Sequence, residues 1–585
     1  MNGFFKMMLA TVAGVLLSGV LLLVVMLVIG LSSMSDGPQV KPCSVLVLDV
    51  REVDMEERAS ADNPYAWLRN GKMPRSIGLN DWCNVLKAAA EDPNINGVSL
   101  ELGSLQTSPA TLEAMRKALL KFRESGKFVY AYGIGLTQGE YYLATAADSI
   151  YLHPQGSLLF KGLTSQVLYF KDMMDKWGVD MQVVRHGTFK SAVEPFISNR
   201  MSVDNRLQIS EYLQSIWGTM CRDISRSRGI DRKILNAVAD NLMLYDNPQA
   251  ALSTRFVDGL VYEDTYRTLL KLRTERLDTN KVHEVTFADY RKKAALEKTA
   301  PYKVAVVYAV GNIVDGEASS DGIGEEFLET LRKVRRDKSV KAVVLRVNSG
   351  GGSALMSERI WREICLLKKD RPVVVSMGDV AASGGYYIAC AADCIVAEAT
   401  TITGSIGVFG MFANVGKTLS QKLGVCAESV NTNQSSDWIS SLRPMTMSEY
   451  EVMQQSVDRV YDTFVRRVAD GRHLGVQYVD RIAQGRVWTG KDAVSRGLVD
   501  TLGGLDVAVS IAASQAKLAK YSIMERPVME SMFERIMSSL SKEVRMKSAL
   551  SQSVPEILQP YYAMEKGLRE SRGIQARLPY IISIQ

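Results

Sequence analysis

A serine followed by two glycines, Ser383-Gly384-Gly385, lies between an apolar stretch and a run of small residues. Residues 372–377 have the composition of a buried strand, and residues 388–392 suit a closely packed helix. A serine at a helix N-terminus can act as a nucleophile, because free backbone N–H groups and the helix dipole stabilise a developing oxyanion. The alternative is that Ser383 only caps the helix.

A second strand-to-helix turn lies upstream of the serine. The apolar run at residues 341–347 is followed by three consecutive glycines at residues 350–352. Glycines at such a position let the backbone turn sharply and bring an N–H group close to a ligand. Together the turns offer the two donors that acyl transfer requires, one at Gly384 and the other at Gly351 or Gly352.

The elements that must position these turns occur twice in the chain. When the sequence is shifted so that Asp92 falls on Asp337, matching residues recur without a gap as far as Asp148 and Asp393. A chain of 585 residues has room for several domains, and two copies of one α/β unit are the simplest interpretation. We predict an anchor at residues 1–40, an N-terminal repeat at 41–300, a C-terminal repeat at 301–522 and a tail at 523–585.

The two copies differ where chemistry would occur. Gln138 occupies the place of Ser383, and residues 105–107 replace the glycine triplet, so the N-terminal copy lacks a nucleophile. It contains Lys190 instead, in a Gly-x-x-Lys stretch that precedes a proline. A lysine acts as a base only when it is neutral, so burial must lower its pKa from ~10.4. Taken alone, a lysine in a polar loop is usually a solvated surface residue.

The two turns resemble those of the Clp protease and crotonase superfold and, more narrowly, the signal peptide peptidase A family of Ser/Lys membrane proteases. The family often has proline where Gly350 stands, which changes the stiffness of the turn but not its chemistry. The resemblance implies an α/β fold, a tandem repeat of two crotonase/Clp-protease-like domains after an N-terminal transmembrane helix. It rests on residues 348–353, 379–387, 403–408, 485–490 and 497–500.

The resemblance also implies roles for individual residues. Ser383 is expected to be the nucleophile and Lys190 the general base of a membrane-anchored serine endopeptidase with a long, two-repeat chain. Ser405 lies in a matching motif and is a candidate to orient the lysine amine, although a turn serine equally often bonds its own backbone. The expected substrates are cleaved signal peptides and other unfolded or membrane-derived peptides, and the expected assembly is a homotetramer.

Three alternatives remain open at this point. The chain has four histidines, and His186 lies near Lys190, so a Ser–His pair is not excluded by spacing. A crotonase-type acyl-CoA enzyme would use the same oxyanion hole without Ser383 or Lys190. A catalytically inactive scaffold that binds membrane proteins would need neither residue.

Residues 7–31 carry no charged side chain and are rich in Leu, Val and Ala. A bilayer span needs ~20 apolar residues, whereas the apolar core of a cleaved signal peptide has ~7–15. Lys6 precedes the stretch and Asp36 follows it, which weakly favours a cytoplasmic N-terminus. We therefore predict a single-pass protein of the cytoplasmic (inner) membrane, in contact with lipid through residues 7–31. The resemblance places the catalytic body on the periplasmic side.

The composition indicates an ordinary globular body, with 46% hydrophobic and 23% charged residues. The net charge of +6 is small and spread along the chain, which argues against nucleic-acid binding. Seven cysteines without paired spacing do not form a disulfide framework, and Cys390 and Cys394 are interpreted as packing residues. No phosphate-binding or dinucleotide motif occurs, so we predict no cofactor and no metal.

Overall fold

The structure is a computed structural model that describes most of the chain between residues 40 and 528 and a short segment near the C-terminus. The predicted membrane span at residues 7–31 lies outside the described residues, apart from Gly14 and Leu17. No helix within the described part is long and apolar enough to span a membrane. The described residues are 14, 17, 40–58, 75–274, 282–294, 300–316, 318, 322–528 and 574–577.

The N-terminal repeat is built on a six-stranded sheet with the order β8-β6-β5-β4-β1-β9. Every neighbouring pair in this sheet is parallel, as expected for strands joined by helical crossovers. Its strands are Ser44–Asp49 (β1), Ile95–Leu102 (β4), Phe128–Leu136 (β5), Ser149–Leu158 (β6), Gly259–Leu260 (β8) and Glu284–Thr286 (β9).

The sheet of the C-terminal repeat places equivalent strands in the same order, β20-β16-β15-β13-β10-β21, again with parallel pairing. Its strands are Lys303–Val310 (β10), Val340–Ser349 (β13), Val373–Ala382 (β15), Cys394–Ala397 (β16), Thr501–Leu502 (β20) and Ser522–Arg526 (β21). Strand β21 carries the sheet beyond the predicted boundary at residue 522, because it pairs with β10 in the way that β9 pairs with β1.

Two further strands attach to the same sheet on the side of the serine turn. Strand β17 (Ile402–Gly404) pairs with the end of β15, and β19 (Val487–Thr489) pairs antiparallel with β17. These two strands contain parts of the motifs at residues 403–408 and 485–490. The sheet therefore brings both motifs to the edge where β15 ends.

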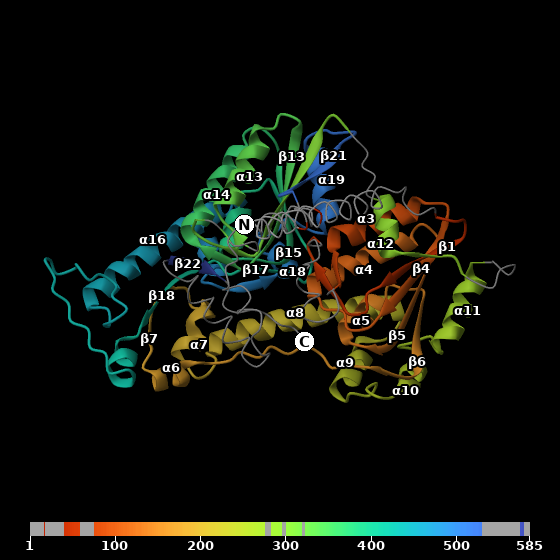
Figure 1. Cartoon of the computed structure of the whole chain (residues 1–585), viewed down its shortest axis with the longest axis horizontal. Coiled ribbons are helices and arrows are strands. Elements are labelled where there is room, and N and C mark those ends of the chain that lie inside the picture. The colour runs from red at the N-terminus through yellow and green to blue at the C-terminus, as the bar shows by residue number, and fades with distance from the viewer. Residues whose placement is uncertain are drawn as a thin grey trace, which may run out of the picture.

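Helices cover both repeats at equivalent places. The helix that precedes the second strand is Leu79–Glu91 (α3) in one repeat and Glu325–Arg336 (α13) in the other. The next helices are Pro109–Arg123 (α4) and Ala354–Leu367 (α14), followed by the short helices Gln138–Ala144 (α5) and Gly384–Ala389 (α15). Figure 1 also shows two long helices, Val203–Arg228 (α8) and Met447–Arg472 (α16), that extend along the molecule.

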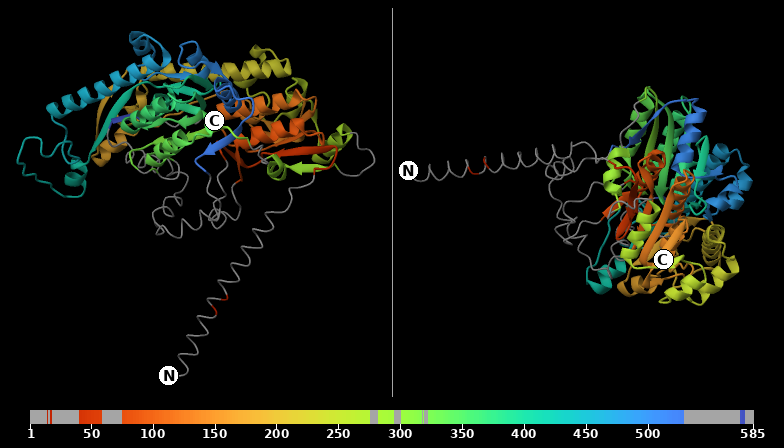
Figure 2. Two further views of the ribbon diagram at one scale, coloured as in Figure 1. Left: turned by 90° about the horizontal axis from the view of Figure 1, so that it is seen from above. Right: turned by 90° about the vertical axis from the view of Figure 1, so that its right-hand side faces the viewer.

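A third sheet joins the two repeats, with the order β12-β11-β14-β22-β18-β7. Strand β7 belongs to the N-terminal repeat, yet it pairs antiparallel with β18 from His186 opposite Val408 to Asp180 opposite Asn414. The pairing carries the chain that follows β7 into the C-terminal repeat, next to the turn before β18. Figure 2 shows the two repeats beside one another, the N-terminal repeat mainly in red and orange and the C-terminal repeat mainly in green and blue. The strands are Asp180–His186 (β7), Asn312–Ile313 (β11), Gly322–Ile323 (β12), Gly351–Ser353 (β14), Val408–Asn414 (β18) and Ile574–Arg577 (β22).

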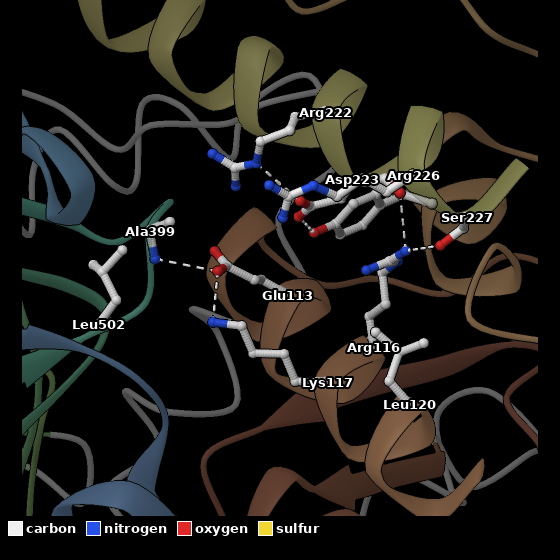
Figure 3. A pocket seen from close by; sticks show the side chains of 11 residues that line it. Glu113, Arg116, Lys117, Leu120, Arg222, Asp223, Arg226, Ser227, Ala399 and Leu502 are labelled. Carbon is white, nitrogen blue, oxygen red and sulfur yellow. Dashed lines mark hydrogen bonds and ion pairs between the residues drawn. The ribbon is translucent and has the colours of Figure 1, made fainter. Parts of the chain in front are cut away.

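A group of charges also connects the repeats, and Figure 3 shows Lys117 and Glu113 of this group beside Ala399 of the C-terminal repeat. Lys117 of α4 forms ion pairs with Glu113, at 2.7 Å, and with Glu398, which follows β16. Glu113 also accepts a hydrogen bond of 3.0 Å from the backbone N–H of Thr400. Burial and the Glu113 carboxylate together raise the pKa of Glu398 to about 7. Lys117 thus pairs with one carboxylate from each repeat. A pocket of about 320 Å³ lies beside these charges, and neither Ser383 nor Lys190 lines it.

The Lys117→Met substitution should destabilise the protein by leaving Glu113 and Glu398 unpaired. Breaking a fully buried pair costs ~3–5 kcal/mol, but the Lys117 side chain is 45% exposed, so we expect a loss of about 1–2 kcal/mol. The loss should be larger at about pH 8 than at about pH 6, because Glu398 is uncharged below its pKa.

Urea denaturation at the two pH values measures this difference. Lys121→Met is the matched control, because Lys121 pairs with Asp506 at 3.4 Å on the surface and its side chain is 68% exposed. An equal loss at both pH values for Lys117→Met would contradict the account of this junction.

Candidate active site

Ser383 occupies a strained position between a strand and a helix. It follows β15 and is the N-cap residue of α15, with φ 56° and ψ −116°. A non-glycine residue rarely adopts a positive φ, and such strain is found where the surrounding structure fixes a functional residue. The Ser383 N–H donates a hydrogen bond of 2.8 Å to the Gly404 carbonyl oxygen, which holds the turn in place.

Lys190 and Ser405 meet the serine hydroxyl. The Lys190 Nζ atom lies 2.8 Å from Ser383 Oγ, 3.1 Å from Ser405 Oγ and 3.3 Å from the Ser405 carbonyl oxygen. Lys190 comes from the loop between β7 and the short 3₁₀ helix Ser191–Val193 (η1) of the N-terminal repeat. The structure therefore brings together three residues that the sequence places in two different repeats.

The lysine amine lies in a dry environment. Both Lys190 and Ser383 are 0% exposed. The Phe409 ring lies 6.0 Å from Nζ, and it belongs to an apolar cluster with Val193 and Met411. Burial is the cause that lowers the pKa of Lys190 well below its ordinary value of 10.5, because the charged form loses its hydration.

Close backbone packing holds the lysine loop in this position. The Phe189 N–H donates a hydrogen bond of 2.8 Å to the carbonyl oxygen of Gln484. A Cβ atom on the next residue, Gly485, would lie 2.7 Å from the Lys190 nitrogen, so a side chain does not fit there. The glycine at the start of the motif at residues 485–490 is thus required by the lysine loop.

Ser405 also has an unusual backbone conformation, with φ 50°. Its N–H donates a hydrogen bond of 2.7 Å to the Arg486 carbonyl oxygen. Its side chain lies against Lys190 and is 0% exposed. The structure therefore places the Ser405 hydroxyl where a group that orients the amine would stand.

The glycine triplet reaches the serine turn through Gly351. A Cβ atom on Gly351, which has φ 96°, would lie 2.5 Å from the Gly384 nitrogen. Gly352 faces away from this point, because a Cβ atom there would collide with the Ile313 carbonyl group. The Gly351 N–H donates to Ser349 Oγ at 3.1 Å. Of the two predicted partners, Gly351 is therefore the one that lies beside Gly384.

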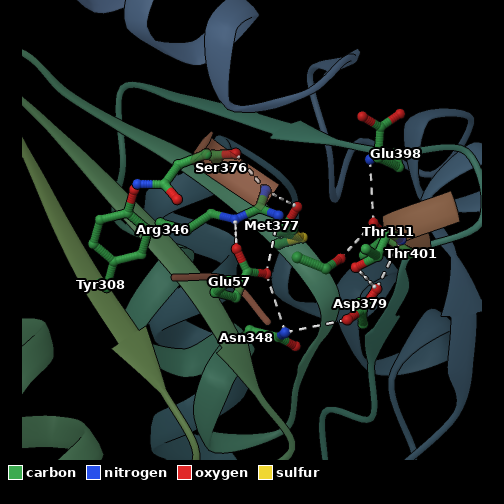
Figure 4. Close-up of polar contacts among 12 residues, drawn as sticks. Glu57, Thr111, Tyr308, Arg346, Asn348, Ser376, Met377, Asp379, Glu398 and Thr401 are labelled. Carbon is green, nitrogen blue, oxygen red and sulfur yellow. Dashed lines mark hydrogen bonds and ion pairs between the residues drawn. The ribbon is translucent and has the colours of Figure 1, made fainter. Parts of the chain in front are cut away.

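A polar network fixes the two turns relative to one another (Figure 4). Asn348 accepts a hydrogen bond of 3.1 Å from the Val380 N–H and donates to Asp379 at 3.3 Å. Asn348 also donates to Glu57, which forms a bidentate pair with the buried Arg346 at 2.8 and 3.0 Å. The strand that ends in the glycine turn is thus tied to the strand that ends in Ser383.

The same network reaches into the N-terminal repeat. Thr111, at the start of α4, donates to Asp379 from its backbone N–H at 2.9 Å and from its hydroxyl at 2.8 Å. Asn348 and Asp379 belong to the motifs seen in the sequence, but sequence reasoning assigned them no role. Their place at the carboxyl ends of neighbouring strands was the signal that would have singled them out.

His186 does not take the place of the lysine. Its Nδ1 atom lies 2.7 Å from Asp458, and its ring stacks on Tyr461 at a centroid distance of 3.8 Å. Within the described residues, the side chain that bonds Ser383 Oγ is Lys190. The geometry therefore favours the lysine over the histidine alternative.

The described residues contain no group of three or more His, Cys, Asp or Glu side chains placed to hold a metal ion. Cys390 is fully buried, and its thiol donates to the Tyr387 carbonyl oxygen at 3.2 Å. This thiol packs within the helix that begins at the serine turn.

Comparison with known proteins identifies the family. The model of peptidase family S49 matches residues 121–276 and 366–519. Protease 4 of Haemophilus influenzae is 39% identical, over 75% of this chain and 74% of that protein. Protease 4 of Salmonella typhi is 38% identical, with 80% and 76% covered. The chloroplastic serine protease SPPA of Arabidopsis thaliana is 35% identical, with 74% and 64% covered.

Among solved structures, a ClpP1 mutant from Listeria monocytogenes is 14% identical, with 35% of this chain and 94% of that chain covered. The TM-score of this match is 0.23. The two ranges that the family model matches lie in different repeats, and the Protease 4 relatives match three quarters or more of the chain. The chain belongs to peptidase family S49 and is a serine peptidase.

Proposed function

We propose that this peptidase cleaves peptide bonds with a Ser/Lys dyad whose two members come from different repeats. The observation that supports the proposal is a buried lysine amine 2.8 Å from a serine hydroxyl. Ser383 attacks the scissile carbonyl, and Lys190 is the general base. We also propose that the two repeats, which position the dyad, have the fold of crotonases and Clp proteases.

The hydrogen bonds around Nζ suggest how the base works. A neutral amine has two N–H groups and one lone pair. In the proposed neutral state the N–H groups donate to the hydroxyl and carbonyl oxygens of Ser405, at 3.1 and 3.3 Å, and the lone pair accepts the proton of Ser383 across the 2.8 Å contact. After attack, the Lys190 ammonium returns this proton to the leaving amine and then, neutral again, activates water to hydrolyse the acyl-enzyme.

The tetrahedral oxyanion would be held by backbone N–H groups. We assign Gly384 as the first donor and Gly351 as the second, its N–H being shared with Ser349 Oγ. Each donor of this kind contributes roughly 3–4 kcal/mol to transition-state stabilisation.

The substrates and location are also proposals. An apolar, uncharged stretch at residues 7–31 supports a single membrane anchor, with the catalytic body on the periplasmic side of the inner membrane. A protease held at the membrane would meet cleaved signal peptides and other unfolded or membrane-derived segments. We further propose a homotetramer.

The Ser383→Ala and Lys190→Met substitutions should each strongly reduce the rate of peptide cleavage. Removing the base is expected to lower kcat/KM by about 10²–10⁴-fold, and removing the nucleophile by at least as much. Because Met retains the packing of Lys190 without a buried amine, Lys190→Met should be no less stable than wild type in thermal unfolding.

Cleavage of a fluorogenic peptide by purified full-length protein is the measurement. The exposed Lys161→Met is the matched control and should leave the rate unchanged. If Ser383→Ala cleaves the peptide as fast as wild type while its circular dichroism is unchanged, the proposed function is wrong.

The rate of cleavage should depend on pH through Lys190. Since only the neutral amine accepts a proton, kcat/KM should rise with pH and level off well below 10.5. Because the unfolded chain binds this proton up to about pH 10.4, stability should also rise with pH between the lowered pKa and that value. Lys190→Met should remove this part of the slope. A kcat/KM profile that levels off only near the ordinary lysine pKa would contradict the proposal.

Removing the Ser405 hydroxyl should impair positioning of the base. The Ser405→Ala variant should lose about 10–100-fold in kcat with little change in KM, because the amine loses one of its two acceptors. The exposed Ser435→Ala is the control. A change confined to KM would show that Ser405 acts on substrate binding and not on the amine.

A further inference from the structure

Two arginines are buried in the part of the chain that the structure describes, and they differ in their partners. Arg346 is 2% exposed and forms a bidentate pair with Glu57. Arg116, on α4, is 5% exposed and forms no ion pair with a carboxylate of the described residues. A guanidinium is always charged, and a charge taken out of water is costly without a counter-ion. Arg116 therefore stands as a buried cation whose counter-ion is not among the described side chains.

The groups that do contact Arg116 are uncharged. Its Nε atom donates to Thr145 Oγ1 at 3.1 Å, and its Nη2 atom donates to the Asp223 carbonyl oxygen at 3.2 Å and to Ser227 Oγ. The Tyr142 ring lies 5.2 Å from the guanidinium carbon. A guanidinium has five N–H groups, and these bonds use three of them. The two on Nη1 form no hydrogen bond with the described residues.

Arg116 lines the pocket of about 320 Å³ at the junction of the repeats, together with two arginines of α8 (Figure 3). Arg222 bonds the Asp223 carboxylate through Nε at 3.2 Å, so the N–H groups of its two Nη atoms are left over. Arg226 is exposed and forms no hydrogen bond or ion pair with the described residues. Three guanidinium groups with unused donors thus border one small pocket.

The carboxylates around the pocket do not neutralise it. Glu113 and Glu398 share Lys117, and Asp223 pairs with Arg222. Four cationic side chains line the pocket, and these three carboxylates are fewer even when Glu398 is ionised. The pocket therefore has an excess of positive charge that favours an anion.

We propose that this pocket binds a small phosphate-bearing anion, which is the counter-ion of Arg116. Planar guanidinium groups match the oxygens of a phosphate in pairs of parallel hydrogen bonds. A phosphate monoester carries close to two negative charges and three strong acceptor oxygens, which suits the unused N–H groups of three arginines. The proposal is independent of the peptidase mechanism, because neither Ser383 nor Lys190 lines the pocket.

The position of the pocket gives the bound anion a role in stability. Arg116 and the α8 arginines belong to the N-terminal repeat, whereas Ala399 and Leu502 line the pocket from the C-terminal repeat. An anion in this pocket contacts both repeats, so it should stabilise their packing as any ligand of the folded state does.

Calorimetric titration of the full-length protein in detergent with inorganic phosphate, at constant ionic strength, tests the proposal. Wild type should bind phosphate saturably, and Arg116→Gln and Arg226→Gln should each weaken binding about tenfold or more, because each removes a charged donor. Phosphate should also raise the Tm of wild type more than that of either variant.

Arg206→Gln is the matched control. Arg206 is exposed on the same helix, about 30 Å from Arg226 along its axis, and the variant should bind phosphate like wild type. Arg226→Gln decides the question if Arg116→Gln fails to fold, because Arg226 is exposed. Absence of saturable binding by wild type, or an unchanged affinity in Arg226→Gln, would overturn the proposal.

A second titration identifies the source of the phosphate. Glycerol 3-phosphate and dihexanoyl phosphatidic acid, kept below its micelle concentration, present the same phosphate monoester without and with acyl chains. Similar affinities would indicate a soluble phosphate ester, and tighter binding of the lipid would indicate a phospholipid head group. Either result supports the phosphate site, whereas binding of neither compound would contradict it. Ser383→Ala should bind as wild type does, so loss of peptidase activity leaves this test intact.

Discussion

The site depends on keeping one amine out of water. With an ordinary pKa of ~10.4, a lysine is neutral at pH 7 in only about one molecule in a few thousand, which would cost the base more than three orders of magnitude in rate. Burial removes most of this cost, since it disfavours the ammonium. In this protein Lys190 is fully buried, and the groups that bond its amine are the hydroxyls of Ser383 and Ser405 and one carbonyl oxygen.

The need to bury the amine explains why the serine and the lysine come from different repeats. If the lysine and the serine belonged to one repeat, that repeat alone would have to exclude water from the amine. Here the third sheet encloses the lysine. Strand β7 pairs with β18, and the loop after β7 is packed between Gly485 and the apolar cluster around Phe409. The N-terminal repeat has Gln138 where the other has Ser383, and in the proposed mechanism it contributes the base. The contacts of Thr111 with Asp379, and of Lys117 with Glu398, hold the N-terminal repeat against the C-terminal repeat.

Local patterns in the sequence were sufficient for the strand-to-helix turns and for the repeat. The ungapped match from Asp92 to Asp148 corresponds to strands that take equivalent places in two sheets of the same order. Lys190 was assigned by resemblance, since nothing in its own stretch shows that it is buried.

Other features could not be predicted from the sequence, because they depend on contacts between segments that are far apart along the chain. The pairing of β7 with β18, the bond between Glu57 and Arg346, and the insertion of residues 574–577 beside β14 each join parts of the chain far apart in sequence. A four-residue strand also has too little pattern to be recognised within the C-terminal tail. The continuation of the sheet past residue 522 was hidden for a similar reason, because β21 is an edge strand defined by its pairing with β10.

The ionisation of Lys190 in the resting protein is the most direct test of this account. Heteronuclear NMR of protein labelled at lysine Cε, with Lys190→Met to assign the signal, would follow the amine as the pH is changed. The account predicts that the Lys190 signal titrates well below 10.5 and that the amine is neutral where the enzyme is active. A Lys190 signal that titrates together with those of the surface lysines would contradict it.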